Sequence, residues 1–259
     1  MILLALLAAA VQATGPPPPI RALFVGNSFT FGNDLPELVS ELGRSLDPPV
    51  TIEVGMTARD GMTLERHWRE GGVARRLREE NWDVLVLQEQ SSRPVTDPDV
   101  MEDYVRRFAA AARDVGAEVI LFQTWARVGE PGTGRPRAAT YRRLSDAVGA
   151  KLAPVGDAWS LARARLPAVP LHARDGLHAS RAGTYLSAAV LLAVIAGRSP
   201  ESARATTSSE PDSAAALRAL AWRAIAPRGA VERPDSVRPG SRRPSPSRTN
   251  GGRREMRDD

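Results

Sequence analysis

The chain has 259 residues, which is enough for one α/β domain with extended ends and too few for two separate enzymatic domains, since single domains usually run to about 100–200 residues. It contains no cysteine, so disulfides, thiolate metal sites and lipid-modified cysteines are excluded. The net charge of +5 would suit a nucleic-acid-binding protein, but the nine arginines and five acidic residues of 227–259 carry +4 of it, which leaves the body almost neutral and predicts no nucleic-acid partner.

The first 13 residues, MILLALLAAAVQA, predict a signal peptide, because an apolar stretch ends in the small-residue pattern Val11-Gln12-Ala13. A stretch of about a dozen apolar residues is too short to span a bilayer comfortably. A buried N-terminal strand and a membrane anchor are the alternatives. Residues 14–19, TGPPPP, break regular structure and are predicted to be a spacer. We therefore expect a secreted or periplasmic protein whose mature chain begins at Thr14 and has no transmembrane segment.

Apolar runs and helical patterns alternate along residues 20–200, where we place the folded domain. The runs are short and bounded by turn residues, as in strands buried on both faces; they are IRALFV (20–25), VTIEV (50–54), DVLVLQ (83–88), AEVILFQTW (117–125) and the weaker LAPVG (152–156). Helical patterns cover 35–46, 64–80, 98–115, 136–151 and 180–196. Asp34 is expected to cap the first of these helices, with Glu37 at its third position. Ser180 is expected to cap the last. This order predicts a parallel sheet with helices on both faces and a ligand site at the carboxyl ends of the strands.

The chain beyond residue 200 is predicted to contain two further parts. Residues 201–226 form a linker, rich in serine and acidic residues, that leads into one helix over 213–226. Residues 227–259 lack aromatic residues and apolar periodicity, so they cannot bury enough surface to fold. We expect them to be a disordered basic tail.

Polar residues and a glycine stand at the places where this sheet would present a site. Ser28 comes three residues after the first strand, Gly61 lies beyond the second, and Gln88 ends the third. Asp175 and His178 are three residues apart on a turn before the last helix of the domain. This spacing lets the carboxylate reach the imidazole and select its tautomer, so that the other ring nitrogen can take a proton from a serine. A serine needs such a neighbouring base, because its hydroxyl is a poor nucleophile at neutral pH.

Each of these residues also has an ordinary structural explanation. Ser28 could satisfy backbone groups in a turn, Asp175 could be a turn acid, and His178 could be partly buried against a carbonyl. The order Ser, Asp, His, with acid and base adjacent in a chain that has only three histidines, favours the catalytic interpretation. Trp68 and Trp125 are candidates either for the wall of a substrate groove or for core packing.

The blocks FVGNSFT (24–30), Gly61, VLVLQEQSS (84–92) and DGLHAS (175–180) resemble the spaced motifs of the SGNH (GDSL-type) hydrolase superfamily, over roughly residues 20–200. They are similar in particular to a branch of bacterial hydrolases whose first block begins Gly-Asn-Ser-Phe-Thr. The resemblance implies a flavodoxin-like, three-layer α/β/α fold with about five parallel strands. It also implies Ser28 as nucleophile, His178 as base and Asp175 as its orienting acid. The oxyanion hole would then consist of the N–H groups of Ser28 and Gly61 and one side-chain amide.

Two positions depart from the family's usual motifs. The residue before the serine is Asn27 instead of aspartate, and it can bond to the loop but adds no charge. The Gly-x-Asn block after the third strand is replaced by QEQSS (88–92). A glutamine amide donates two N–H bonds, as asparagine does, so we expect Gln88 to be the third oxyanion donor, with Gln90 or Ser92 in its place if the strand ends later. The alternative for Gln88 is a polar strand end that bonds to a neighbouring loop.

These observations predict a secreted serine esterase that hydrolyses an ester, such as an O-acetyl group on carbohydrate, through an acyl-Ser28 intermediate. Small-molecule or glycan esters are the expected substrates, and no metal or other cofactor is expected. Two alternatives belong to other classes. One is a catalytically silent carbohydrate-binding relative, in which Ser28 and His178 would lie apart, and the other is an envelope interaction protein that acts through its basic tail.

Overall fold

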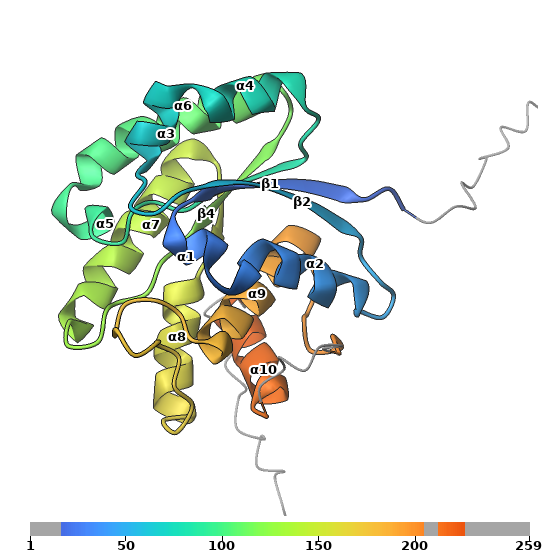
Figure 1. Cartoon of the computed structure of the whole chain (residues 1–259), viewed down its shortest axis with the longest axis vertical. Helices are drawn as coiled ribbons and strands as arrows, with labels where there is room; N and C mark the ends of the chain where they lie inside the picture. Colours follow the sequence, from blue (N-terminus) through green and yellow to red (C-terminus); the bar gives the residue numbers. More distant parts are fainter. Residues whose placement is uncertain (1–16, 205–211, 226–259) are drawn as a thin grey trace, which may run out of the picture. The chain divides into compact units, whose positions relative to one another are not determined.

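The computed structural model describes residues 17–204 and 212–225. The predicted signal peptide (1–13), the first half of the spacer and the basic tail (227–259) lie outside the described residues. Five strands form one sheet in the order β2-β1-β3-β4-β5, and every neighbouring pair is parallel (Figure 1). This is the flavodoxin-like order, so the predicted parallel sheet is confirmed. The strands are β1 (Ile20–Gly26), β2 (Ile52–Ala58), β3 (Val84–Leu87), β4 (Glu118–Phe122) and β5 (Lys151–Ala153).

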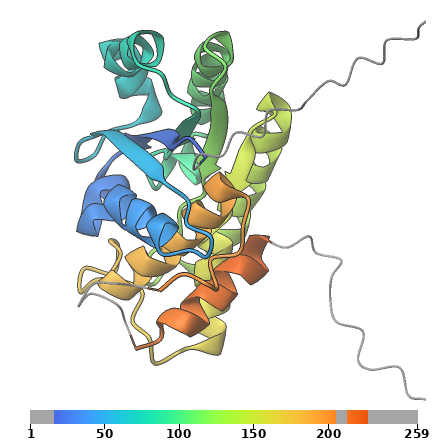
Figure 2. The ribbon, with the colours of Figure 1, turned by 90° about the vertical axis from the view of Figure 1, so that its right-hand side faces the viewer.

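The sheet lies between two layers of helices, which confirms the predicted three-layer fold (Figures 1 and 2). Successive strand residues point to opposite faces, so Ala22 and Phe24 belong to one core and Leu23 and Val25 to the other. The first core is covered by α2 (Leu35–Arg44), α8 (Val155–Arg165), α9 (Arg181–Ala196) and α10 (Ala214–Ile225). The second is covered by α3 (Leu64–Glu70), α4 (Gly72–Glu79), α6 (Pro98–Asp114) and α7 (Gly134–Val148).

Helix α9 is buried along nearly its whole length, between the sheet, α2 and α10. Ser180 caps it as predicted, because the Ser180 Oγ accepts the N–H of Gly183 at 3.1 Å. Helix α10 packs on α8 and α9, and its Arg218 donates a 2.6 Å hydrogen bond to the Tyr185 hydroxyl. In the part of the chain that the structure describes, no helix combines the length and the apolar character needed to cross a membrane.

The structure corrects several local predictions. Residues 64–80 form two helices instead of one, because Gly71 takes a left-handed conformation (φ 71°) and ends α3. The second strand begins at residue 52 instead of 50, since the N–H of Val50 turns back to the Gly43 carbonyl at the end of α2. The last predicted strand, 152–156, ends early at Ala153. Pro154 has no N–H to extend the ladder, and α8 follows it.

The segment between β1 and α2 also differs from expectation. It contains a one-turn helix, α1 (Ser28–Phe31), and a 3₁₀ turn, η1 (Gly32–Asp34). Asn33 and Asp34 both adopt left-handed conformations (φ 51° and 55°). Asp34 occupies the predicted N-cap position of α2, with Glu37 in the first turn, but its side chain makes no capping hydrogen bond. The other short elements are α5 (Arg93–Thr96) and η2 (Pro131–Thr133).

The strand order places a switch point between the ends of β1 and β3. From β1 the chain moves to one side to form β2 and then crosses to the other side to form β3, so the connections that leave β1 and β3 separate at this point. Such switch points are where open α/β sheets bind ligands. Val25 pairs with Leu87, so the segments that begin at Gly26 and Gln88 reach this edge together.

Candidate active site

The loop after β1, residues 27–34, is called the nucleophile loop here because it carries Ser28, the expected nucleophile. Ser28 is the first residue of α1, and Asn27 caps that helix because its Oδ1 accepts the N–H of Phe29 at 3.1 Å. The Asn27 Nδ2 donates to the Met62 carbonyl at 2.9 Å, so the same amide joins the loop after β1 to the loop after β2. An aspartate, which has no N–H, could not make this second bond. The departure from the usual aspartate therefore adds a link between two loops.

Gln88 follows β3 directly and supports the nucleophile loop from within the protein. Its Oε1 accepts hydrogen bonds from the Asn27 N–H and the Thr30 hydroxyl, both at 2.9 Å, and its Nε2 donates to the Glu89 carbonyl at 2.6 Å. A Cβ atom on Gly26 would lie 2.4 Å from the Gln88 Oε1, so only glycine permits this approach. The side chain of Gln88 is fully buried, and no part of it reaches the surface beside Ser28.

Asp175 and His178 lie on a hairpin, residues 171–180, whose two arms are joined by backbone hydrogen bonds. The Asp175 Oδ1 accepts the N–H groups of Leu177 and His178 at 2.9 and 3.0 Å. The Asp175 Oδ2 lies 2.5 Å from the His178 Nδ1. The hydrogen bond to His178, followed by those from the two N–H groups, lowers the pKa of Asp175 to about 2. The carboxylate is therefore charged at neutral pH.

The hairpin 171–180, called the base loop after His178, the expected base, contacts the nucleophile loop directly. The His178 Nε2 lies 3.0 Å from the Ser28 Oγ, although 150 residues separate the two in sequence. A histidine with its proton on Nδ1 satisfies both contacts, because it donates to Asp175 and accepts from Ser28. Such an arrangement can remove the serine proton as the oxygen attacks an electrophile. The structure brings the three predicted residues together, whereas a silent relative was expected to hold Ser28 and His178 apart.

A stack of aromatic rings lies beneath this contact. Phe29 packs edge-on against His178 and stacks face to face on Trp125, with ring centres 4.4 Å apart. Trp125 stacks in turn on Trp159 at 4.0 Å. The Trp125 Nε1 donates to the Leu177 carbonyl at 3.0 Å, one residue before His178. Trp125 is buried and supports the base loop, so it belongs to the core instead of a groove wall.

Trp68, the second candidate for a groove wall, lies elsewhere. It packs edge-on against Phe108 of α6, with ring centres 5.1 Å apart, in the core on the opposite face of the sheet from Trp125. It is therefore also a packing residue.

The expected oxyanion donors are available to different degrees. Gly61 lies in the loop after β2 with φ 63°. Within residues 17–204 and 212–225, neither its N–H nor that of Ser28 has a hydrogen-bond partner. The Gln90 Oε1 accepts from the N–H and the hydroxyl of Ser92 at 2.9 and 2.8 Å, which occupies the Ser92 hydroxyl. The Gln90 Nε2 bonds to no described group, in contrast to the Nε2 of Gln88.

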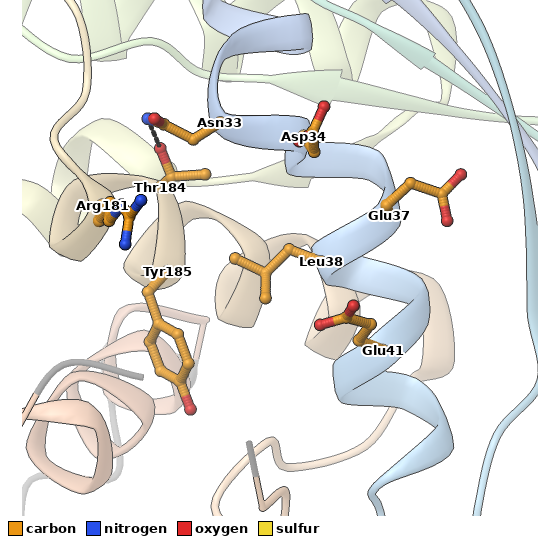
Figure 3. A pocket seen from close by; sticks show the side chains of 8 residues that line it. All are labelled: Asn33, Asp34, Glu37, Leu38, Glu41, Arg181, Thr184 and Tyr185. Atoms are coloured by element: carbon orange, nitrogen blue, oxygen red, sulfur yellow. Dashed lines mark hydrogen bonds between the residues drawn. The ribbon is translucent and has the colours of Figure 1, made fainter. Parts of the chain in front are cut away.

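A pocket of about 240 Å³ opens beside Ser28 and His178 and is also lined by Phe31 and Asn33. Asn33 also lines a second hollow of about 270 Å³ between α2 and the start of α9 (Figure 3). The Asn33 Nδ2 donates to the Thr184 hydroxyl at 2.8 Å, as the dashed line in Figure 3 shows. The lining of the second hollow includes four charged residues: Asp34, Glu37, Glu41 and Arg181.

Two residues at the site were not expected from the sequence. Asn33 links the nucleophile loop to the base loop, since its Nδ2 also donates to the Ala179 carbonyl at 3.1 Å. Glu89 is completely buried behind Gln90. An asparagine beside a turn glycine tolerates a left-handed backbone, which is a weak sequence signal for Asn33. Nothing in the sequence marks Glu89. Across the described segments, no cluster of three or more His, Asp or Glu side chains could hold a metal ion.

No family model and no curated protein matches the chain. Among solved structures, it is similar to a DUF4886 family protein from Bacteroides uniformis, with 20% identity, a TM-score of 0.69 and coverage of 80% of this chain and 95% of that one. It is also similar to Axe2, an acetylxylan esterase from Geobacillus stearothermophilus, with 18% identity, a TM-score of 0.54 and coverage of 68% and 94%.

A third structure, from Slackia heliotrinireducens and described as "a putative SGNH hydrolase", is 30% identical to this chain, with a TM-score of 0.58. The match covers 69% of this chain and 100% of that protein. At that identity and coverage, and with the same three-layer fold, the chain belongs to the SGNH (GDSL-type) hydrolase superfamily.

Proposed function

We propose that the protein is a secreted serine esterase that hydrolyses a carboxylic ester through an acyl-Ser28 intermediate. The 3.0 Å contact between the His178 Nε2 and the Ser28 Oγ, beside the switch point between β1 and β3, is the observation that carries the proposal. The charged Asp175 on the other ring nitrogen completes an acid–base–nucleophile chain.

The reaction has two halves. The Ser28 Oγ attacks the ester carbonyl while His178 takes its proton, and the tetrahedral intermediate collapses when His178 returns that proton to the leaving alcohol. Water then attacks the acyl-Ser28 ester, with His178 again as base, and releases the carboxylic acid. Throughout, Asp175 holds the imidazole by Nδ1 and stabilises its protonated form.

Three donors are proposed for the oxyanion hole: the N–H groups of Ser28 and Gly61 and the amide of Gln90. The two N–H groups have no partner among the described residues, and the Gln90 Nε2 is likewise unbonded there. Gln88 was the first expectation for the third donor. Its buried amide is engaged at both ends, which favours Gln90 for that place and a supporting role for Gln88.

The proposed substrate is an O-acetyl ester of a carbohydrate. The 240 Å³ pocket beside Ser28 has room for a short acyl group. The polar lining of the neighbouring hollow suits a hydroxyl-rich alcohol (Figure 3). The similarity in fold to an acetylxylan esterase supports the same substrate class.

The covalent step is tested with a serine-directed phosphonate followed by peptide mapping. We expect one label per chain at Ser28, and loss of both labelling and p-nitrophenyl acetate hydrolysis in a folded Ser28→Ala variant. Undiminished turnover by that variant in a pure sample would contradict the proposal. Deletion of 227–259 is the control for action through the tail, and it should leave turnover unchanged.

Secretion is tested separately. Its support is the apolar segment 1–13 with its Val-Gln-Ala ending, which predicts Thr14 as the mature N-terminus. Terminal sequencing of the protein from its native host should find Thr14 first. An intact Met1 on protein from the cytoplasm would contradict export.

A further inference from the structure

Glu89 is a buried acidic residue that the proposed reaction does not use. It lies between Gln88 and Gln90, its exposed fraction is 0%, and no arginine, lysine or histidine forms an ion pair with it among the described residues. A carboxyl group in such a place is costly unless its hydrogen bonds compensate. Its position behind the proposed oxyanion hole suggests that those bonds serve the site.

The bonds of Glu89 join two loops. Its Oε1 accepts the N–H of Gln90 at 2.6 Å and the N–H of Leu64 at 3.3 Å, while its Oε2 has no partner among the described residues. Leu64 begins α3, three residues after Gly61. One carboxylate oxygen therefore connects the segment that carries the Gly61 N–H to the segment that carries the Gln90 amide.

Two other side chains complete a ring of loop-to-loop bonds. Gln88 connects the loop after β3 to the loop after β1 through the Asn27 N–H, and Asn27 connects the loop after β1 to the loop after β2 through the Met62 carbonyl. Glu89 makes the third connection, from the loop after β3 to the loop after β2. Without it, the Gly61 and Gln90 donors would be held to Ser28 but not to each other.

We propose that Glu89 is a positioning residue that sets the distance between the Gly61 and Gln90 donors of the oxyanion hole. This inference rests on the proposed function. What it requires of residue 89 is an acceptor oxygen at the end of a side chain long enough to reach both N–H groups. The negative charge itself is not required, since a neutral amide oxygen can also accept two hydrogen bonds.

Two conservative variants of Glu89 separate the effect of side-chain length from the effect of charge. Glu89→Gln keeps the reach and the acceptor, so kcat should stay within about three-fold of wild type. Glu89→Asp keeps the charge but is one methylene shorter and cannot bridge both N–H groups. Its kcat should fall by about 10²-fold with KM nearly unchanged, because a small misplacement of transition-state donors is enough for such a loss. Rates are taken per site titrated with the phosphonate, and thermal unfolding is followed in parallel.

Glu65→Asp is the matched control. Glu65 also belongs to α3, but among the described residues its carboxylate pairs only with the side chains of Arg69 and Arg93, at 2.8 and 2.9 Å. The same shortening there should leave kcat within about two-fold.

Each outcome decides the inference. A fall in kcat for Glu89→Gln but not for Glu89→Asp would mean that charge, not reach, is what matters, and would overturn it. A lower unfolding temperature for Glu89→Asp, with unchanged kcat per titrated site, would reduce Glu89 to a stability role and also overturn it. Failure of the wild-type protein to take one phosphonate at Ser28 would instead contradict the proposed function.

Discussion

The oxyanion side and the base side of the candidate site are built in different ways. On the oxyanion side, Asn27, Gln88 and Glu89 are buried, and their side chains connect loops that lie between 25 and 61 residues apart in sequence. On the base side, the side chains of Asp175 and His178 are 49% and 38% exposed, and the bonds that shape their turn span two or three residues.

This difference predicts how each side responds to substitution. A buried polar group that loses its partner costs about 1–3 kcal/mol of folding free energy, whereas an exposed one exchanges its partner for water. Removal of one of the buried polar side chains on the oxyanion side should therefore reduce stability. Changes on the base side should reduce the rate and leave the fold largely intact.

The largest effect is expected on the exposed base side, from Asp175→Asn. The asparagine Oδ1 can still accept the Leu177 and His178 N–H groups, so the turn is retained. The amide cannot select the required tautomer or stabilise the imidazolium, and kcat should fall by about 10⁴-fold, or roughly 5 kcal/mol, with little change in unfolding temperature. Because the wild-type pKa is lowered to about 2, Asp175 itself should not limit activity until the pH approaches that value. A large loss of stability in Asp175→Asn would contradict the expectation that changes on the base side leave the fold intact.

The next largest effects separate Gln90 from Gln88. Gln90→Met removes the proposed oxyanion donor and should lower kcat by about 10²–10³-fold, or roughly 3–4 kcal/mol, at almost unchanged stability. Gln88→Met leaves the Asn27 N–H, the Thr30 hydroxyl and the Glu89 carbonyl unpaired, and should lower the free energy of unfolding by about 3 kcal/mol. Both are measured as kcat per titrated site alongside urea unfolding. A loss of kcat in Gln88→Met but not in Gln90→Met would mean that Gln88 is the third oxyanion donor.

Glu89 should also make stability depend on pH. Burial raises its pKa from 4.5 to about 7, so between these values the folded state keeps a proton that the unfolded chain has released. Stability should therefore fall as pH rises from about 4.5 to about 7, by an amount on the order of 3 kcal/mol at most, and level off above. The charged or titratable groups that face Glu89 are Glu65 of α3, Arg93 of α5 and Tyr141 of α7.

Glu89→Gln isolates this contribution, because all the other titrating groups remain. The difference between the wild-type and Glu89→Gln unfolding free energies, measured by urea titration at several pH values, should decline across that window. A difference that does not change with pH would show that the buried carboxyl titrates normally.

The smallest effect is expected from Trp125→Phe, which keeps a ring in the aromatic stack but loses the hydrogen bond to the Leu177 carbonyl. One such bond contributes about 1 kcal/mol, so kcat should fall by roughly five-fold as the base loop loosens. Trp159→Phe is the matched control. The Trp159 Nε1 bonds to the Ser187 hydroxyl and not to the hairpin 171–180, and phenylalanine keeps a ring to pack against His172 of that hairpin, so this change should lower stability without changing kcat per titrated site.

The base side was the more predictable of the two. The Asp175-x-x-His178 spacing and the Ser180 cap depend on neighbours within three residues, so the sequence shows them directly. The ends of β1 and β3 were also predictable from apolar runs to within one residue, and Gln88 stands directly after β3. The direction of its side chain was not, because it depends on the missing Cβ of Gly26, 62 residues earlier.

Other features depended on packing that no local pattern reveals. Glu89 stands in a polar block that would ordinarily be solvent-exposed, and its burial follows from the approach of α3 and α7 to the end of β3. The break between α3 and α4 at Gly71 and the helix after Pro154 could not be predicted, because apolar residues continue through both positions.

The 150-residue separation between Ser28 and His178 has a consequence for the order of events during synthesis. Ser28 and all the proposed oxyanion donors are made in the first 90 residues, but the base arrives only when the hairpin before α9 has formed and docked. Until then the serine hydroxyl has no proton acceptor and is chemically inert toward esters. A ribosome-bound or truncated chain that ends before residue 178 lacks the proposed base and should not turn over. Hydrolytic activity would therefore appear in a single step, when the hairpin that carries His178 has docked beside Ser28.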